Sequence, residues 1–224
     1  MSVWAVLAAA GRGERLQLDR PKAFAQLRGR PMLAESLERL EASPWVDAIV
    51  VVAPPGWEEP VILLAEELGC GKVVASVAGG ESRADSVRLG VAEVDREAAA
   101  VLVHDAARPL LPDGLVEQLL QPLGEGWDGA VPGLPLADTV KRVRDGAVEE
   151  TLARAELVAV QTPQAFVASV LREATAGAAQ ATDCSTLVEA RGGRVKVVPG
   201  DPRLLKVTTP DDLALVERWL AERA

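Results

Sequence analysis

The chain has 224 residues and a formal charge of −9 at pH 7, and 49% of its residues are hydrophobic. This length suits one α/β domain with a full core, so we treat residues 1–224 as a single domain. The acidic balance argues against nucleic acid or an anionic membrane as a partner, because both reward a broadly basic surface.

The two cysteines and the N-terminal segment bear on the cellular compartment. Cys70 and Cys184 lie far apart and outside any metal-ligand spacing, which predicts free thiols, a reducing compartment and no zinc site. The apolar residues 2–7 lack a basic leader, and arginines follow too soon for a signal peptide or a membrane span. We therefore expect a cytoplasmic protein.

Short apolar runs alternate with helical patterns along the chain. The first half predicts strands at residues 4–8, 48–53, 73–77 and 100–103, with helices at 32–41, 59–68 and 82–94 between them. The second half predicts a helix near 112–121, a strand around 130–134, a helix near 164–178, a strand near 195–198 and a final helix from Asp211. Such alternation indicates a mostly parallel, doubly wound α/β sheet, and the nearly all-apolar strands indicate helices on both of its faces.

Residues 139–160 break this pattern. Two β-like stretches flank Asp145-Gly146, a dipeptide typical of a hairpin turn. The hairpin carries too little apolar surface to pack within its own chain on both faces. Two interpretations stay open from the residues alone: a solvated edge hairpin, or an arm that projects and pairs with a second subunit.

The loop after the first predicted strand has the composition of a phosphate-binding loop. Its small residues would let backbone N–H groups approach phosphate oxygens, and we expect Gly11 and Gly13 to supply positive φ angles. Glycines at such a junction often only make a turn. Here four cations within eleven residues favour a polyphosphate ligand: Arg12, Arg15, Arg20 and Lys22.

Asp105 directly follows a predicted buried strand, at the sheet edge where doubly wound folds bind ligands. A carboxylate there can hold Mg²⁺ together with phosphate oxygens, or it can cap the following turn. The nearby phosphate loop favours Mg²⁺. The neighbouring His104, the one histidine of the chain, is expected to be structural.

Lys206 also follows an apolar stretch, and at the open edge of the sheet it would be costly without an anion nearby. The residues after it predict a helix start, with Thr209 or Thr208 as the cap and Pro210 at the first position.

Residues 79–87 again join a strand to a helix. Ser82 as the helix cap with Asp85 as its capping-box partner explains most of this segment. Gly80 and Ser86 remain candidate contacts for a nucleotide base.

Two other nucleotide-binding motifs are absent. A dinucleotide-binding loop would place a third glycine where Leu16 stands, and the Gly-x-x-x-x-Gly-Lys-[Ser/Thr] motif of P-loop kinases does not occur.

Taken together, these segments resemble the 2-C-methyl-D-erythritol 4-phosphate cytidylyltransferase family of the non-mevalonate isoprenoid pathway, over most of the chain. The resemblance rests on residues 9–16, Pro21-Lys22, 80–86, Asp105-Ala106-Ala107-Arg108-Pro109, Asp138-Thr139-Val140-Lys141, Gln161-Thr162-Pro163-Gln164 and Lys206-Val207-Thr208. It implies a Rossmann-like nucleotidyltransferase fold and a reaction in which the phosphate of methylerythritol phosphate attacks the α-phosphate of CTP, with Mg²⁺, releasing pyrophosphate. A phosphate monoester is already an anion, so this chemistry needs cations and a metal rather than a general base.

The resemblance also implies roles for individual residues. The catalytic cations would be Arg15, Lys22 and Lys206, and Asp105 would bind Mg²⁺. The positions that match the CTP contacts, joined by Gly13 of the loop, are Ala9, Ala10, Gly11, Gly80, Ser86 and Ala106. Arg108 and Thr139 would contact methylerythritol phosphate, as would Arg154 and Thr162 from the other subunit.

Family enzymes are dimers whose arm reaches into the neighbouring site, so the resemblance implies a homodimer with residues 137–160 as an exchanged β-hairpin arm. One motif departs from the family pattern: its Thr-Asp-Asp-Ala-Ser stands here as Thr182-Asp183-Cys184-Ser185-Thr186, so one acid is missing. Two other functions stay open: a related cytidylyltransferase acting on ribitol 5-phosphate, and a nucleotide-binding module without catalysis.

Overall fold

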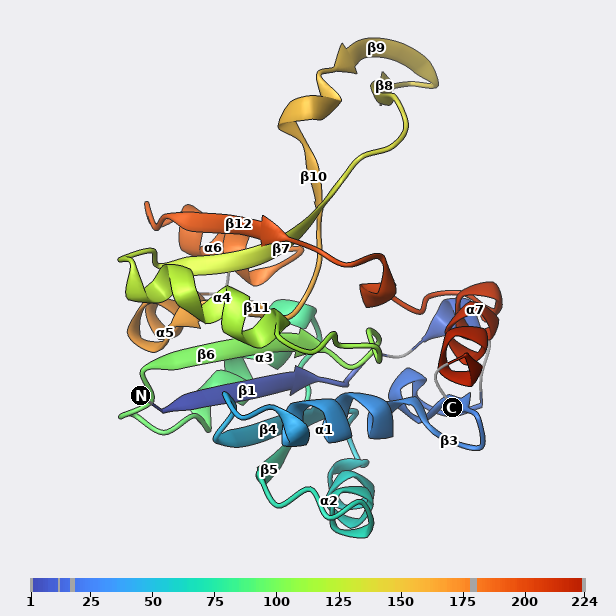
Figure 1. The fold of residues 1–224 in the computed structure, drawn as a ribbon, viewed down its shortest axis with the longest axis vertical. Helices are drawn as coiled ribbons and strands as arrows, with labels where there is room; N and C mark the ends of the chain where they lie inside the picture. Colours follow the sequence, from blue (N-terminus) through green and yellow to red (C-terminus); the bar gives the residue numbers. More distant parts are fainter. Residues whose placement is uncertain (1, 12, 17–18, 178–180, 223–224) are drawn as a thin grey trace.

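A mixed β-sheet forms the centre of the molecule (Figure 1). The structure is a computed structural model that describes residues 2–11, 13–16, 19–177 and 181–222. Within these residues the sheet has eight strands. Seven follow the order β10-β7-β11-β6-β1-β4-β5, and β12 also pairs with β7. The strands are β1 (Val3–Ala8), β4 (Ala48–Ala53), β5 (Val73–Ala78), β6 (Ala100–Asp105), β7 (Gly129–Pro135), β10 (Val158–Val160), β11 (Gln164–Val167) and β12 (Val195–Pro199).

The pairing of the strands confirms a mostly parallel sheet with an antiparallel insertion. β6, β1, β4 and β5 run parallel, as do β12 and β7. β11 runs antiparallel to both β6 and β7, and β10 runs antiparallel to β7.

The helix expected at residues 164–178 was wrong at its beginning, because residues 164–167 form β11. Ala165 and Phe166 are both fully buried but belong to the cores on opposite faces of the sheet, which is the alternation of a strand. The helix α5 runs only over Ala168–Thr175, and Ala178 lies outside the described residues.

Helices cover both faces of the sheet, as the double winding predicts. One core packs α1 (Met32–Ala42), α2 (Glu58–Glu67) and α4 (Leu115–Gly124) against Leu7 and Val51, among other strand residues. The other packs α3 (Arg83–Ala92), α5 and α6 (Cys184–Glu189) against residues that include Val6 and Val52. The short helix α6 was not anticipated from the sequence.

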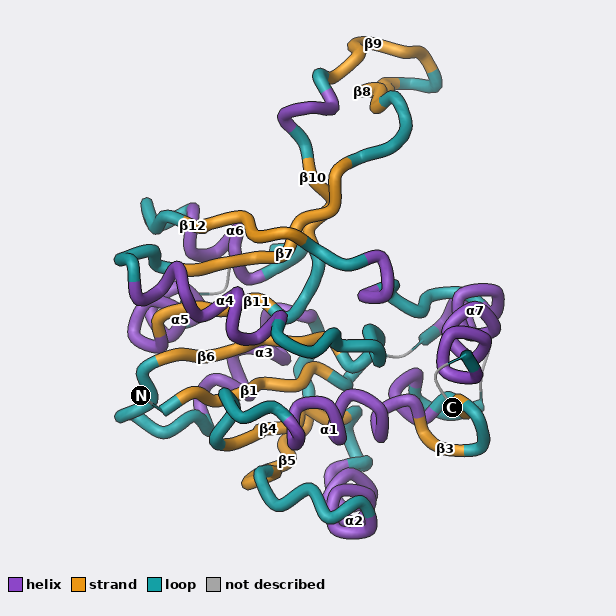
Figure 2. The backbone as a smooth tube through the Cα atoms, viewed as in Figure 1, coloured by secondary structure: helices purple, strands orange, loops and turns teal. Residues whose placement is uncertain are grey.

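The C-terminal helix α7 (Pro210–Ala221) lies beside the N-terminal loops (Figure 2). Thr209 caps it in a reciprocal capping box with Asp212, which confirms the predicted helix start. A third apolar cluster includes Leu27, Met32 and Val216, and joins α7 to the loops around β2 (Gln26–Leu27) and β3 (Arg30–Pro31).

The hairpin of β8 (Val140–Arg144) and β9 (Ala147–Leu152) extends away from the sheet as an arm (Figure 1). Asp145 and Gly146 at its turn have φ angles of 49° and 78°, as a type I′ turn requires. The predicted hairpin is therefore confirmed.

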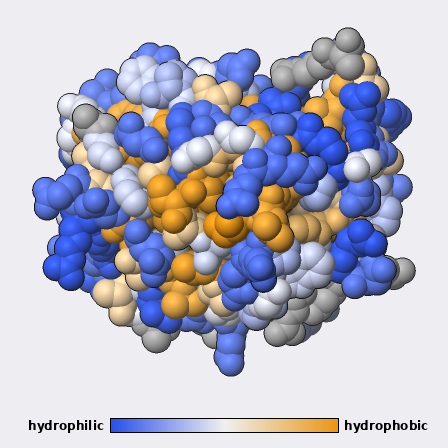
Figure 3. Space-filling model, turned by 90° about the horizontal axis from the view of Figure 1, so that it is seen from below, coloured by the Kyte–Doolittle hydropathy of each residue, from blue (hydrophilic) through white to orange (hydrophobic). Residues whose placement is uncertain are grey.

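The face seen from below carries a group of hydrophobic residues among hydrophilic ones (Figure 3). Among the described residues, no helix combines the length and the apolar character that crossing a membrane demands.

Candidate functional site

A cavity of about 530 Å³ opens where the carboxyl ends of the parallel strands meet. Its walls come from the loop after β1, the loop after β5, the end of β6 and the segment before α7. Most residues predicted for the site line it: Ala9, Ala10, Gly11, Gly13, Arg15, Lys22, Gly80, Ser86, Asp105, Ala106 and Lys206. The fold thus brings together residues that are almost 200 positions apart in the chain.

The glycines of the first loop act in different ways. Gly13 has a φ of 72°, as predicted, and a Cβ there would lie 2.7 Å from Cβ of Lys22. The expected positive φ at Gly11 was wrong; a Cβ at this position would meet nothing within 4 Å. Gly11 therefore leaves the cavity open beside the backbone, while Gly13 lets Lys22 pack closely. The predicted cation Arg12 lies outside the described residues.

The opposite wall is the start of α3. Ser82 caps this helix by accepting a hydrogen bond from the Asp85 N–H at 3.0 Å. The predicted capping box is only half present, because the Asp85 carboxylate accepts the Ser82 hydroxyl at 2.6 Å. Ser86 is buried and its Oγ accepts from the Gly80 N–H at 3.1 Å, so the two predicted base contacts are joined to each other.

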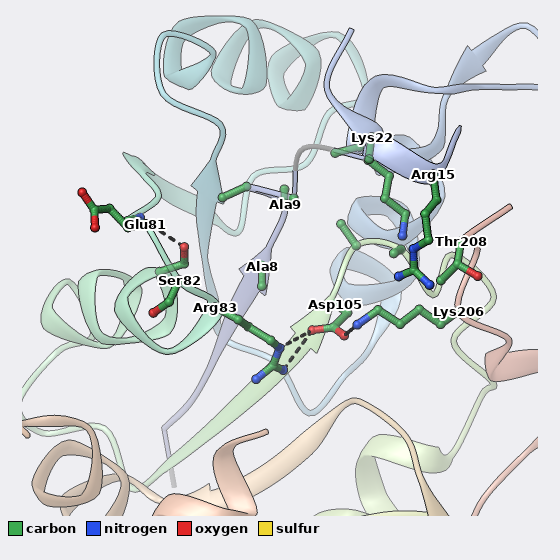
Figure 4. Close-up of a pocket in the computed structure, with 18 residues that line it drawn as sticks. Ala8, Ala9, Arg15, Lys22, Glu81, Ser82, Arg83, Asp105, Lys206 and Thr208 are labelled. Atoms are coloured by element: carbon green, nitrogen blue, oxygen red, sulfur yellow. Dashed lines mark hydrogen bonds and ion pairs between the residues drawn. The ribbon is translucent and has the colours of Figure 1, made fainter. Parts of the chain in front are cut away.

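Asp105 lies between two cations at the end of β6 (Figure 4). Its Oδ1 accepts from Nε and Nη2 of Arg83 at 3.1 and 2.9 Å, and its Oδ2 accepts from Nζ of Lys206 at 2.6 Å. The Asp105 side chain is only 8% exposed. Burial alone would raise the pKa of this carboxyl, but Arg83 and Lys206 together hold the pKa well below its usual range. Asp105 is therefore the anion that Lys206 was expected to need at the open edge of the sheet.

Lys22 and Arg15 lie beside Lys206 in the same cavity (Figure 4). Burial and the neighbouring charges of Lys206 and Arg15 lower the pKa of Lys22 to about 8. The three cations line one cavity, where a bound anion would reduce the repulsion between them.

His104 is a structural residue, as expected. The ring is fully buried, with Nε2 3.1 Å from the Arg108 carbonyl oxygen and Nδ1 3.3 Å from Oγ1 of Thr162. The carbonyl can only accept, so Nε2 carries the proton. Burial lowers the pKa of His104 to about 4, and the ring is neutral at pH 7.

The four residues predicted to contact the sugar phosphate do not line this cavity. Thr139 and Arg154 are exposed at the arm, where Nη1 of Arg154 donates to the Ala137 carbonyl. Thr162 is buried, and its Oγ1 accepts from the Asp105 N–H at 3.0 Å. Arg108 donates to the Leu204 carbonyl beside the segment that carries Lys206.

Sequence reasoning missed several lining residues, of which Arg83 matters most. The others are Ala8, Ala23, Glu81, Ser82, Ala107 and Thr208. Arg83 stands in the first turn of α3, where a cation opposes the helix dipole. An arginine at this unfavourable position was the sequence signal that could have indicated an acidic partner across the site.

A doubly wound sheet with a cationic cavity at the ends of its strands fits a nucleotidyltransferase. The family model described as 2-C-methyl-D-erythritol 4-phosphate cytidylyltransferase (IspD) matches residues 3–222. The chain therefore belongs to this family, which confirms the resemblance found in the sequence.

Individual relatives agree with this assignment. The cytidylyltransferase of that name from Saccharopolyspora erythraea is 45% identical over 99% of this chain and 100% of its own length. Its counterpart from Nocardia farcinica is 46% identical over 100% of this chain and 96% of its own. The crystal structure of the enzyme from Thermus thermophilus superposes with a TM-score of 0.78 at 34% identity, covering 96% of this chain and 98% of that one.

Proposed function

We propose that this enzyme joins CTP and 2-C-methyl-D-erythritol 4-phosphate to give 4-diphosphocytidyl-2-C-methyl-D-erythritol and pyrophosphate, a step in isoprenoid precursor biosynthesis. Family membership supports both substrates. The observation that carries the proposal is the convergence of Arg15, Lys22 and Lys206 with one carboxylate, Asp105, in a single cavity. Simple nucleotide binding does not need charge at all four places.

The reaction needs charge neutralisation more than proton transfer. A phosphate oxygen of the sugar forms a bond to the α-phosphorus of CTP, and the bond from that phosphorus to the oxygen bridging to the β-phosphate breaks. Pyrophosphate leaves with the electron pair. The incoming phosphate is already an anion, so the cavity cations serve to reduce repulsion and to stabilise the transition state. His104 is buried, neutral and engaged through both ring nitrogens, which suits a reaction without a general base.

Asp105 is the residue that would hold Mg²⁺. Among the described residues no three acidic, histidine or cysteine side chains form a metal site of their own. One carboxylate at the cavity wall fits a magnesium ion whose remaining ligands are phosphate oxygens and water, the pattern that Mg²⁺ prefers with nucleotides. When bound, Mg²⁺ would neutralise part of the triphosphate charge.

The sugar-phosphate half of the site is proposed to be shared in a homodimer with exchanged arms. Thr139 and Arg154 are exposed at an arm that extends away from the sheet of its own chain (Figure 1), and neither lines the cavity. We propose that Arg154 contacts the substrate of the neighbouring subunit, and that Thr139 and Arg108 also bind the sugar phosphate. Because the Thr162 hydroxyl is engaged by the Asp105 N–H and by His104, we assign Thr162 to supporting Asp105 instead.

A substrate screen tests the function. CTP, UTP, ATP and GTP are each combined with methylerythritol phosphate or ribitol 5-phosphate, and pyrophosphate release is measured with Mg²⁺ present. We expect turnover with CTP and methylerythritol phosphate. Faster turnover with ribitol 5-phosphate would instead establish the related activity, and CTP binding without pyrophosphate release would indicate a binding module.

Mixed dimers test the shared site. Arg154→Ala and Arg15→Ala subunits should each be nearly inactive alone, but a mixed dimer would contain one site with both arginines intact. Random mixing in a two-fold dimer should therefore restore roughly a quarter of the wild-type rate. A mixture no more active than either parent would rule out sites shared through Arg154.

A further inference from the structure

Arg83 lines the cavity but has no role in the proposed reaction. Its Nε and Nη2 hold Oδ1 of Asp105 (Figure 4). Its Nη1 lies 3.7 Å from Sγ of Cys184. The guanidinium thus connects the start of α3, the end of β6 and the start of α6. Its side chain is 24% exposed.

The helix itself does not explain this arginine. A cation in the first turn of α3 opposes the helix dipole, and partial burial of its charge adds a desolvation cost. Asp105 compensates for both, which indicates that Arg83 is present because of Asp105.

The two partners of Asp105 are unequal. Lys206 makes one contact, to Oδ2, from a flexible side chain that is 39% exposed. Arg83 makes two contacts to Oδ1 through a rigid planar group. Lys206 is therefore the partner that can turn toward a ligand, while Arg83 stays.

Cys184 does not compete with Asp105 for the Arg83 guanidinium. The thiol is buried, and burial raises its pKa to about 11, so it is neutral at pH 7. An acid at this position would compete with Asp105 for the guanidinium. The departure from the Thr-Asp-Asp-Ala-Ser pattern thus removes a competitor for Arg83.

We propose that Arg83 is a positioning residue that keeps the buried Asp105 carboxylate paired, so that Lys206 is free to leave Asp105 and bind the triphosphate. Without Arg83 and with no Mg²⁺ bound, the departure of Lys206 would leave a carboxylate that is 8% exposed without a partner, which is strongly unfavourable. This inference rests on the proposed function, because it requires a triphosphate to draw Lys206 away.

A double-mutant cycle on CTP binding tests it. The dissociation constant of CTP is measured by isothermal titration calorimetry in EDTA for wild type, Arg83→Gln, Lys206→Met and the double variant. In the wild-type background Lys206→Met should weaken binding about tenfold, the loss of one charge-assisted hydrogen bond. In the Arg83→Gln background it should weaken binding less than about threefold, because Lys206 already stays on Asp105.

If Lys206→Met weakens CTP binding by the same factor in the wild-type and Arg83→Gln backgrounds, the inference is overturned, because Arg83 then contributes only its own charge. Failure of the wild type to bind CTP with Mg²⁺ restored would overturn the proposed function as well, so the two failures can be told apart.

Two further variants complete the design. Arg88→Gln removes the same charge from an exposed position on α3 and should leave CTP binding within about twofold of wild type. Arg83→Lys keeps a cation beside Asp105, and serves if Arg83→Gln does not fold. The roughly tenfold effect of Lys206→Met should persist in the Arg83→Lys background, and a collapse of that effect to below about threefold would overturn the inference.

Discussion

The charged form of Lys22 destabilises the folded, ligand-free protein, but the same charge would stabilise a bound triphosphate. Burial, Lys206 and Arg15 lower its pKa from 10.5 to about 8, so the ligand-free protein carries an ammonium that would be more stable in water. A bound triphosphate would reverse this by supplying the missing negative charge. The folded protein should therefore be less stable without a bound anion than with one.

This predicts a pH-dependent gain in stability from removing the charge. The unfolded chain binds the Lys22 proton more tightly than the folded chain, so the destabilisation is complete below pH 8 and disappears as the pH rises to 10.5. Lys22→Met should therefore raise the melting temperature of the ligand-free protein at pH 7, and the difference should shrink between pH 8 and 10.5. Calorimetric melting across this range checks it; a gain that stays constant with pH would contradict the charge as the cause.

The same residue should be essential for turnover. Lys22→Ala and Lys206→Ala are each expected to lower kcat by about 10²–10³, the usual cost of removing one well-placed charge from a transition state. A pyrophosphate-coupled assay measures this. Lys72→Ala is the matched control, because Lys72 donates to the carbonyls of Glu41 and Ser43 outside the cavity and should leave kcat unchanged. Near-wild-type rates in either cavity variant would remove that lysine from the catalytic set.

Helix α3 carries Arg83 and Ser86 to the cavity because it packs unusually close to the sheet. A Cβ at Gly90 would lie 2.6 Å from methyl carbons of both Val52 and Val6. The missing side chain lets the helix lie directly on β1 and β4. The position of the cavity wall therefore depends on one glycine at the other end of its helix.

We predict that Gly90→Ala lowers the free energy of unfolding by about 1–3 kcal/mol, the usual cost of overpacking a core. Gly124→Ala is the matched control: a Cβ at this α4 position meets nothing within 4 Å, and the change should be neutral or stabilise the protein by about 0.5–1 kcal/mol. Urea denaturation with CTP absent measures both. Equal effects of the two substitutions would show that helix propensity, not contact with the sheet, decides them.

At the scale of the whole molecule, the arm and the strand beside it expose apolar side chains. Val143 and Val148 pair across the hairpin and are 58% and 62% exposed, while Val158 and Val160 of β10 are 39% and 38% exposed. A single chain leaves this apolar surface in water, which is typical of an interaction site. The proposed exchange of arms would cover it.

Val148→Asp should therefore shift the protein from dimer to monomer, because a buried, unpaired carboxylate is strongly unfavourable in an interface. Sedimentation equilibrium measures the shift, and activity should fall with it since Arg154 would no longer reach a neighbouring site. Leu63→Asp on α2 is the control, an exposed apolar residue at the end of the molecule opposite the arm, and it should remain dimeric (Figure 1). A variant at position 148 that sediments like the wild type would contradict the exchanged arm.

Local features of the fold were predictable from the sequence because neighbours in the chain determine them. The apolar strands, the capped start of α7 and the Asp145-Gly146 turn each depend on a few consecutive residues. The position of the first loop and of Asp105 at one cavity was predictable as well, since doubly wound sheets bind ligands at the ends of their strands.

Only the tertiary structure decided what depends on distant parts of the chain. Residues 164–167 form a strand because they pair with both β6 and β7, although their composition suits a helix equally. Asp105 pairs with Arg83 and Lys206, which are 22 and 101 positions away, and no periodicity records such a pairing. Charges meet through space rather than along the chain. The sequence therefore indicated most of the cavity residues, whereas the fold added Arg83 and determined which charges pair.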